Sequence, residues 1–254
     1  MTLILNEIHG MGPTRQPLMV AAADRRISNP DGSYHSTRRK LFPAPRIAGS
    51  VSYFGIAAFP QGGRQVFLSE WLPEFIRSSR ATTVAGLTQD LKQSLSTVVP
   101  ARLLRTQPSG FHVCGFDAHG RPDFWFVSNI GAMQGFAYTD LRSSYLEPAS
   151  HFLGRDGEGF GLDPVTGRAP AGRVQIYRNG DFRVHALASE TLDNALRALG
   201  QFADFKLPRT STEYGAYVRF KFEVISYVYK NLARRQIVAR PIDVLVLEAP
   251  KRAV

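Results

Sequence analysis

Apolar residues at the start of the chain form unbroken runs instead of alternating with polar residues. The segments TLILNEI (2–8) and PLMVAAADRRI (17–27) are separated by HGMGPTRQ, which is rich in Gly and Pro. This order predicts a hairpin of two strands. A run without polar alternation is typical of a strand covered on both sides, so we expect both strands to be buried on both faces.

The pattern then changes from short strands to helices. NPDGS (29–33) predicts a turn, and KLFPAPRIAGSVSYFGIAAF (40–59) predicts a pair of strands that its prolines keep short. PQGG interrupts the pattern, and apolar residues then recur at helical spacing. They predict a helix over 63–79, from Phe67, Trp71, Leu72 and Phe75, and a helix over 84–99 with Thr83 as its N-cap.

Strands return in the second half of the chain. GFHVCGFDAHGRPDFWFVS (110–128) predicts a hairpin that turns at 117–120, and the Gly-, Ser- and Pro-rich stretch 128–172 predicts loops with short strands. In RVQIYRNGDFRVHAL (173–187), the pair Asn179-Gly180 predicts another hairpin turn. Two further helices are predicted over 189–203 and 213–235, followed by a closing strand in PIDVLVLEAP (241–250).

The order of these elements favours one fold class. Strands, two helices, strands, two helices and a last strand predict an α+β protein, a four-layer αββα sandwich with a helix pair outside each of two stacked sheets. A doubly wound sheet would instead alternate single helices with strands. With no internal repeat, low-complexity tract or linker, we expect one domain over 1–254.

Composition narrows the setting of the protein. The chain has 254 residues, of which 44% are hydrophobic, so it can bury a sizeable interior. Cys114 is the only cysteine, which excludes an internal disulfide. The N-terminus lacks the pattern of a signal peptide, and no apolar run reaches the ~18 residues of a membrane helix. We therefore expect a cytoplasmic protein that does not cross a membrane.

The net charge raises the question of nucleic-acid binding. Lys and Arg number 31 against 21 Asp and Glu, which gives a net charge of +10. The densest basic runs, 38–40 and 234–235, are short, and most other basic residues are scattered among acidic and apolar ones. This distribution is typical of a solvated surface, so we do not expect nucleic-acid binding.

Three residues could form a catalytic group near the tip of the first strand. Asp24 closes a strand that we expect to be buried, and Lys40 follows sixteen residues later, after a loop with room to fold back. If Met1 is removed, Thr2 carries a hydroxyl nucleophile and an α-amine base on one residue. The pKa of an α-amine lies near ~7.7–8.0, and a neighbouring Lys40 ammonium would lower it. Asp24 would keep that lysine oriented and charged.

These residues carry a resemblance to a known family. The chain has Met-Thr and an apolar strand, then Ala-Ala-Asp-x-Arg (22–26), Arg-Lys-Leu (39–41) and a strand of small residues that ends in Gly55. This pattern resembles the proteasome β-subunit family of N-terminal-nucleophile (Ntn) hydrolases, in particular its bacterial homologues.

The resemblance implies an αββα sandwich that cleaves peptide or other amide bonds and assembles into a homo-oligomeric ring. It assigns Thr2 as the nucleophile, Asp24 and Lys40 as the activating pair, and the backbone N–H of Gly55 as an oxyanion donor. Arg26 is expected to be structural, bonding loop carbonyls near the site. Peptides or proteins would be the substrates, and an unfoldase that feeds the ring is an open question.

Some positions depart from the family pattern. The hairpin before Asp24 is longer than usual, and Leu3 stands where a polar residue is common. The family has a serine after a glycine in the later strand region, where the best match in this sequence offers Arg155. The segment 233–241, ARRQIVARP, lacks the family's last acidic residue and serine. A non-catalytic scaffold or binding subunit of the same fold is therefore the alternative to a threonine hydrolase.

Other candidate sites are weaker. The six histidines show no metal-ligand spacing, and one cysteine cannot complete a zinc set, so we expect no metal and no cofactor. They are His9, His35, His112, His119, His151 and His185. The segment 154–159, GRDGEG, predicts a hairpin instead of a phosphate or calcium loop. Cys114 lies within an apolar strand, which predicts a core position instead of a nucleophile.

Overall fold

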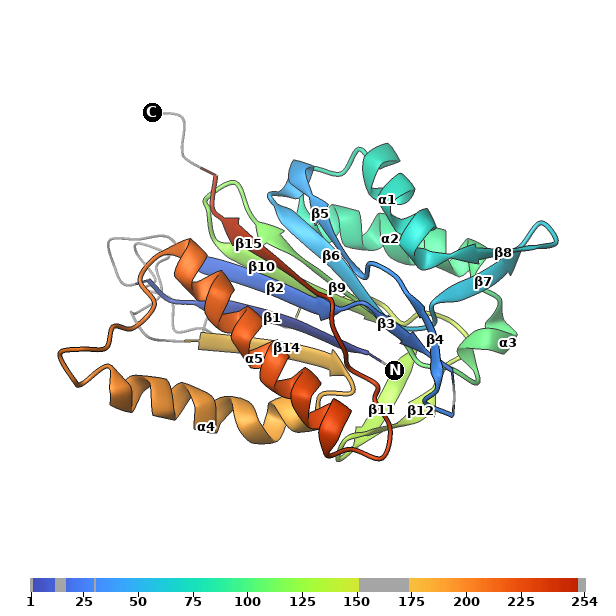
Figure 1. Ribbon diagram of the computed structural model, residues 1–254. Coiled ribbons are helices and arrows are strands. Elements are labelled where there is room, and N and C mark those ends of the chain that lie inside the picture. The colour runs from blue at the N-terminus through green and yellow to red at the C-terminus, as the bar shows by residue number, and fades with distance from the viewer. Residues whose placement is uncertain (1, 12–16, 30, 151–173, 251–254) are drawn as a thin grey trace.

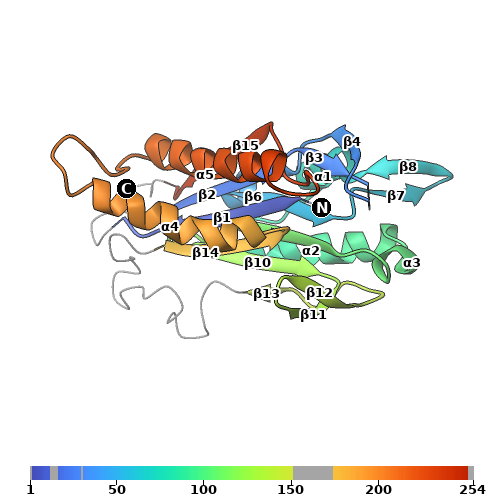
Figure 2. The same ribbon diagram turned by 60° about the horizontal axis from the view of Figure 1, so that its bottom comes forward.

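The computed structural model describes residues 2–11, 17–29, 31–150 and 174–250, and its architecture is mixed α and β (Figure 1). Two antiparallel sheets of four and five strands face each other, and each carries a pair of helices on its outer side (Figure 2). The predicted segment 154–159, and with it Arg155, lies outside the described residues.

The four-stranded sheet contains the N-terminal hairpin at its centre. Its strands, in spatial order, are β14 (Val174–Gly180), β1 (Leu3–His9), β2 (Leu18–Asp24) and β15 (Ile242–Glu248). Helices α4 (Arg183–Leu199) and α5 (Ser211–Asn231) cover its outer face. A buried cluster that includes Leu3, Leu5, Val20, Val218 and Phe222 joins the sheet to α5.

The five-stranded sheet is built in the same manner. Its order is β13 (Ala149–Ser150), β10 (Pro122–Ser128), β9 (Ser109–Phe116), β6 (Gly49–Gly55) and β5 (Leu41–Ala44). Helices α1 (Leu68–Ser78) and α2 (Val84–Val98) lie on its outer face, where leucines at helical spacing on α2 meet the strands. Thr83 accepts a hydrogen bond from the backbone N–H of Gly86 at 3.1 Å, which confirms the predicted N-cap.

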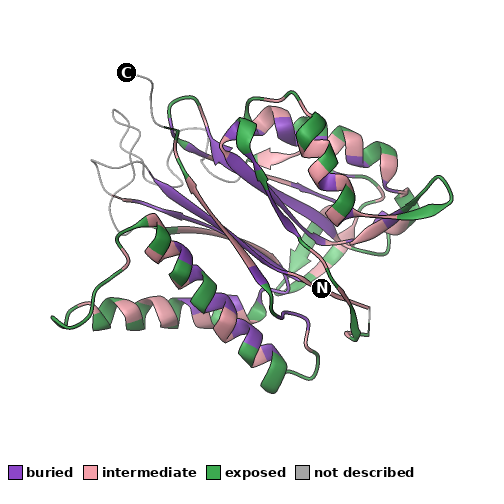
Figure 3. Cartoon of the chain, turned by 45° about the horizontal axis from the view of Figure 1, so that its top comes forward, coloured by how far each residue is buried: buried purple, intermediate pink, exposed green. Residues whose placement is uncertain are grey.

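The inner faces of the two sheets pack against each other. Ile4, Ala21 and Ala23 of the four-stranded sheet contact Leu41 and Phe54 of the five-stranded sheet in one buried cluster. Every residue of β1 and β2 is therefore buried, as the unbroken apolar runs predicted (Figure 3).

Several short elements surround the two sheets. They are β3 (Arg26–Ser28), β4 (Tyr34–Thr37), η1 (Pro45–Ile47), β7 (Ala58–Gln61), β8 (Arg64–Phe67), α3 (Ala101–Leu104), β11 (Ile130–Gln134) and β12 (Ala137–Leu141). The hairpins β3–β4, β7–β8 and β11–β12 are each two-stranded. Figure 1 shows β7–β8 extending from the body of the protein.

The predicted helix over 63–79 is wrong in its first turn. Residues Arg64–Phe67 form β8, paired with Ala58–Gln61, and α1 begins only at Leu68. Gly62 and Gly63 both have positive φ angles, of 57° and 78°. These left-handed glycines turn the chain back on itself, so its backbone groups pair across a hairpin before the helix begins.

The predicted hairpin turn at Asn179-Gly180 is also wrong. β14 ends at Gly180, and α4 begins at Arg183, six residues before the predicted helix start. Gly180 has a positive φ of 92°, but the reason for a glycine here is the close approach of the Thr2 backbone. A Cβ at position 180 would lie 1.9 Å from the carbonyl oxygen of Thr2. The glycine thus lets β14 end against β1.

The last predicted helix is confirmed with shifted ends, because α5 spans Ser211–Asn231 instead of 213–235. Thr210 and Glu213 form a capping box: the hydroxyl accepts from the N–H of Glu213 at 3.3 Å, and the carboxylate accepts from the N–H of Thr210 at 3.1 Å. The closing strand β15 is as predicted, and the one-turn helix α3 was not predicted.

A buried ion pair fastens β1 to α5. The Nζ of Lys221 contacts the carboxylate of Glu7, and both side chains are at most 1% exposed. The Nε2 of His9 lies 3.1 Å from the other carboxylate oxygen. Burial raises the pKa of Glu7, but the imidazoles of His185 and His9 and the charge of Lys221 outweigh burial and hold it well below its usual value.

The substitution Lys221→Met is expected to destabilise the protein by about 3–5 kcal/mol, because it leaves the Glu7 carboxylate buried without its cation. Urea unfolding followed by circular dichroism measures the loss. Lys230→Met, on an exposed position of the same helix, is the control and should change stability by less than ~0.5 kcal/mol. The double variant Glu7→Gln/Lys221→Met should recover most of the loss, and an unchanged unfolding midpoint in Lys221→Met would contradict this account.

Candidate functional site

Three chain segments converge at the N-terminal end of β1. Thr2 directly precedes β1, Asp24 is the last residue of the neighbouring β2, and Lys40 directly precedes β5 in the facing sheet. The Asp24 carboxylate is fixed by two backbone donors, the N–H groups of Leu3 and Arg26, each at 2.9 Å. The site therefore lies on the seam between the two sheets.

The side chains of Thr2, Asp24 and Lys40 contact one another directly. The Thr2 hydroxyl donates to one oxygen of Asp24 and accepts a hydrogen bond from the Nζ of Lys40. Lys40 Nζ also lies 3.2 Å from the other oxygen of Asp24 and donates to the carbonyl oxygen of Arg26. All three side chains are buried, with Thr2 the most exposed at 3%. The structure thus brings together the three residues that the sequence singled out.

The charge of Lys40 depends on this environment. Burial lowers the pKa of Lys40 from its usual value, because an ammonium loses its hydration, while the neighbouring Asp24 carboxylate opposes the shift. An ammonium held in this way donates to the Thr2 hydroxyl, and a lysine with a lowered pKa exchanges its proton more readily. Both properties suit a group that activates a nucleophile.

Arg26 lies beside the triad but directs its side chain elsewhere. Its guanidinium donates to the hydroxyl of Ser28 at 3.1 Å and to the carbonyl of Gly32 at 3.4 Å, and it stacks over the ring of Tyr34. These contacts tie together the β3–β4 hairpin. Arg26 contributes only its backbone to the triad, through the N–H that holds Asp24 and the carbonyl that accepts from Lys40.

Gly55 ends β6, close to a wide cleft beside the triad. Its φ is 85°, and a Cβ at this position would lie 1.8 Å from the carbonyl oxygen of Pro108. Only glycine fits this combination of angle and contact. Among the described residues, the hydrogen bonds of the triad do not include Gly55, and its place as an oxyanion donor stays a prediction.

Sequence reasoning missed Asp181. Its N–H donates to the carbonyl oxygen of Thr2 at 2.6 Å, and its buried carboxylate accepts from the guanidinium of Arg183 and the hydroxyl of Tyr229. Burial raises the pKa of Asp181, but these hydrogen bonds outweigh burial and leave it below its usual value.

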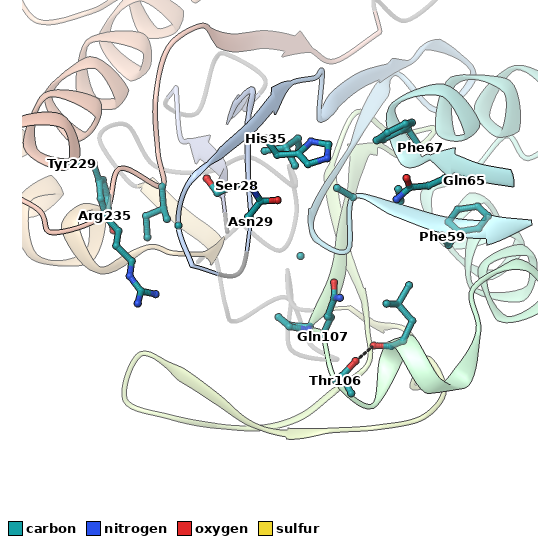
Figure 4. Close-up of a pocket in the computed structure, with 18 of the residues that line it drawn as sticks. Ser28, Asn29, His35, Phe59, Gln65, Phe67, Thr106, Gln107, Tyr229 and Arg235 are labelled. Carbon is teal, nitrogen blue, oxygen red and sulfur yellow. Dashed lines mark hydrogen bonds between the residues drawn. The ribbon is translucent and has the colours of Figure 1, made fainter.

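A cleft of about 1470 Å³ lies near the triad (Figure 4), but Thr2, Asp24 and Lys40 do not belong to its described lining. Its walls come from the β3–β4 hairpin, the end of β6, the β7–β8 hairpin, the end of α3, the start of α4 and the segment after α5. Its lining is connected to the triad through neighbouring residues. Ile27 follows the residue that accepts from Lys40, and Arg183 and Tyr229 both bond Asp181, which holds the backbone of Thr2.

Other candidate positions give no reactive site. Cys114 is fully buried, as predicted for a core residue, and burial raises the pKa of its thiol to about 11. Within the described part of the chain, no three His, Cys, Asp or Glu side chains gather in a way that could hold a metal ion.

No helix among the described residues is long and apolar enough to cross a membrane.

The substitution Gly55→Ala is expected to destabilise the protein more than Gly63→Ala does. Both glycines have positive φ, of 85° and 78°, so alanine costs about 1 kcal/mol at either position. At Gly55 the new methyl also meets Pro108, which adds about 1–3 kcal/mol, whereas nothing lies within 4 Å at Gly63. Thermal unfolding of both variants measures the difference, and equal losses would contradict the close contact at Pro108.

No protein-family model matches this chain, and a search of curated proteins finds no match. The case for a function therefore rests on the residues and on the geometry of the triad.

Proposed function

We propose that this protein is an N-terminal threonine hydrolase that cleaves peptide or other amide bonds, a proteasome-like peptidase subunit. The observation that carries the proposal is the buried contact of the Thr2 hydroxyl with both Asp24 and Lys40. A buried lysine and a buried aspartate are costly unless they pair, and here three chain segments meet to pair them around one hydroxyl. The three residues that meet are those of the sequence motif: Thr2, Asp24 and Lys40.

The chemistry follows from the triad once Met1 is removed. The α-amine of Thr2 takes the proton of its own hydroxyl, and Oγ1 attacks the carbonyl carbon of the scissile amide. The C–N bond breaks as the amine returns the proton to the leaving nitrogen, and an ester with Thr2 remains. Water activated by the same amine hydrolyses that ester and restores the hydroxyl. The Lys40 ammonium stabilises the developing alkoxide, and the N–H of Gly55 is the proposed donor to the oxyanion.

The arrangement of layers supports a four-layer αββα Ntn sandwich as the fold. Two antiparallel sheets pack face to face, and a helix pair lies outside each. Thr2 stands at the end of a strand that is central in its sheet and covered on both faces. A nucleophile in this position is held rigidly, which suits a catalytic group.

We predict that the intact mass of the purified protein corresponds to a chain that starts at Thr2. An electrophilic threonine-directed inhibitor should then add once per chain. Thr2→Ala and Lys40→Ala should abolish the addition and lower peptide hydrolysis by at least ~10³-fold, because members of one catalytic unit do not contribute additively. Mass spectrometry and a fluorogenic peptide assay measure both effects.

Thr106→Ala is the matched control, because Thr106 is an exposed threonine in the wall of the same cleft. It should label and hydrolyse like the unchanged protein, and circular dichroism should show all variants folded. A folded protein that retains Met1 and does not label would contradict the hydrolase proposal. That result would favour the alternative, a non-catalytic scaffold or binding subunit.

Assembly into a homo-oligomeric ring is part of the proposal. Large apolar side chains are exposed on α4 and α5, among them Leu187, Phe220 and Tyr227, with exposed fractions of 72%, 49% and 65%. Phe220 and Tyr227 lie seven residues apart on α5, which places them on the same side of the helix. Exposed apolar patches of this kind often mark protein interfaces.

We expect light scattering to give a mass that is a multiple of 28.2 kDa. The variant Phe220→Ser/Tyr227→Ser should shift the population to smaller species, because it removes apolar area from the surface of α5. Met133→Ser/Leu146→Ser, which changes exposed apolar residues outside the helices, is the control and should leave the mass unchanged. A monomer at high protein concentration would contradict the ring.

A further inference from the structure

The cleft beside the triad is strongly cationic. Four arginines line it, and no aspartate or glutamate belongs to its described lining. They are Arg64, Arg183, Arg234 and Arg235. They come from the β7–β8 hairpin, the start of α4 and the segment after α5, so the positive charge surrounds the opening from several sides. A ligand in this cleft therefore meets several guanidinium groups, and no carboxylate lies in the described lining itself.

Within the described part of the chain, three of these arginines have no carboxylate at ion-pair distance, although the charge of Arg235 acts on nearby Asp31. Arg183 pairs with Asp181, with its Nε at 2.9 Å from the carboxylate. Arg64, Arg234 and Arg235 form no ion pair with any residue that the structure describes. Asp31 lies in the turn that faces Arg235, but its Oδ1 accepts from the N–H and the hydroxyl of Ser33, at 2.8 and 2.7 Å. Their donors remain available to a ligand.

Arg235 is held in place by packing. Its side chain crosses the β3–β4 turn so closely that a Cβ on Gly32 would lie 2.8 Å from its Cδ. Figure 4 shows its guanidinium at the open edge of the cleft. A guanidinium whose stem already lies against the protein loses less conformational freedom on binding an anion than a free surface side chain does.

The cationic cleft is coupled to the nucleophile. Asp181 bonds the backbone of Thr2 on one side and Arg183 and Tyr229 on the other, and both of these residues line the cleft. A substrate that occupies the cleft and reaches Thr2 would pass these residues and come near Arg234 and Arg235, which line the same cleft. Side chains close to the cleaved bond would lie within the positive field.

We infer that the cleft selects peptides that carry Asp or Glu side chains near the cleaved bond, with Arg234 and Arg235 as specificity-determining residues. The inference rests on the proposed hydrolase function and names the substrate class of the same site. Carboxylates accept paired hydrogen bonds from guanidinium groups, and these charge-assisted bonds are among the strongest available to a peptide side chain.

The other features of the cleft favour a peptide over a nucleic acid. Hairpins β3–β4 and β7–β8 are two-stranded, so each leaves an outer backbone edge that an extended peptide can pair with by strand addition. The Arg38 guanidinium, 3.3 Å from the ring centroid of Phe67, covers one face of this ring and leaves less of it for base stacking.

The test measures binding in the Thr2→Ala variant, which cannot cleave the ligand. Fluorescence anisotropy compares a labelled peptide containing several Glu residues with the same peptide in which every Glu is Gln. We expect the Glu peptide to bind about tenfold more tightly, with a difference that shrinks as salt is added. Introducing Arg234→Gln/Arg235→Gln should remove the preference. The control Arg80→Gln/Arg197→Gln removes the same net charge from exposed positions outside the cleft. This control variant should keep the preference for the Glu peptide.

Each outcome bears on one claim. Equal binding of the two peptides, or no binding of either, would overturn the inference whether or not the protein hydrolyses peptides. A single-stranded oligonucleotide of the same charge is the second ligand to test. If it binds more tightly than the Glu peptide, and Arg234→Gln/Arg235→Gln removes this tighter binding, the inference of a peptide ligand is overturned in favour of nucleic acid. A Glu preference in a protein that shows no labelling at Thr2 would support the ligand class and contradict the hydrolase.

Discussion

A lysine can keep its charge between two packed sheets only where a carboxylate and further acceptors replace its lost water. Lys40 meets this condition through Asp24, the carbonyl of Arg26 and the hydroxyl of Thr2. These contacts lie where three segments of the chain end or begin: β1 begins after Thr2, β2 ends at Asp24 and β5 begins after Lys40. If Lys40 or Asp24 is displaced, the charge of the other is left buried and unpaired, so this ion pair constrains both the structure and the geometry of the site.

The strand β1 is held by charge at more than one point. Near its start lies the triad, and in its middle Glu7 pairs with Lys221 on α5. Because successive side chains of a strand point to opposite faces, Glu7 faces the helices while Asn6 faces the second sheet, where it bonds Cys114 and His112. Polar contacts of defined geometry therefore fix the register of β1 on both sides, which apolar packing alone specifies less strictly.

Local pattern was enough to predict the buried N-terminal hairpin and to single out the triad residues, because long apolar runs and the Asp24-to-Lys40 spacing are properties of short segments. The error at β8 came from a local turn at Gly62 and Gly63, and the others arose where a tertiary contact decided the outcome. Asn179-Gly180 has the composition of a hairpin turn, but the approach of β14 to Thr2 uses the glycine for another purpose. Asp181 carries no motif of its own, since its importance depends on an N–H that reaches a residue 179 positions earlier in the chain. The cleft could not be predicted from local sequence either, because its arginines come from segments far apart in the chain.

In the proposed hydrolase, the position of the triad on the seam between the sheets makes the distance between the sheets a catalytic variable. Lys40 belongs to one sheet and Thr2 to the other, so the thickness of the layer between them decides whether Nζ reaches the hydroxyl. Small side chains keep this layer thin, with Ala21 and Ala23 opposite Leu41 and Phe54. Substitutions in this layer that leave the protein folded can therefore silence the site without touching any reactive atom.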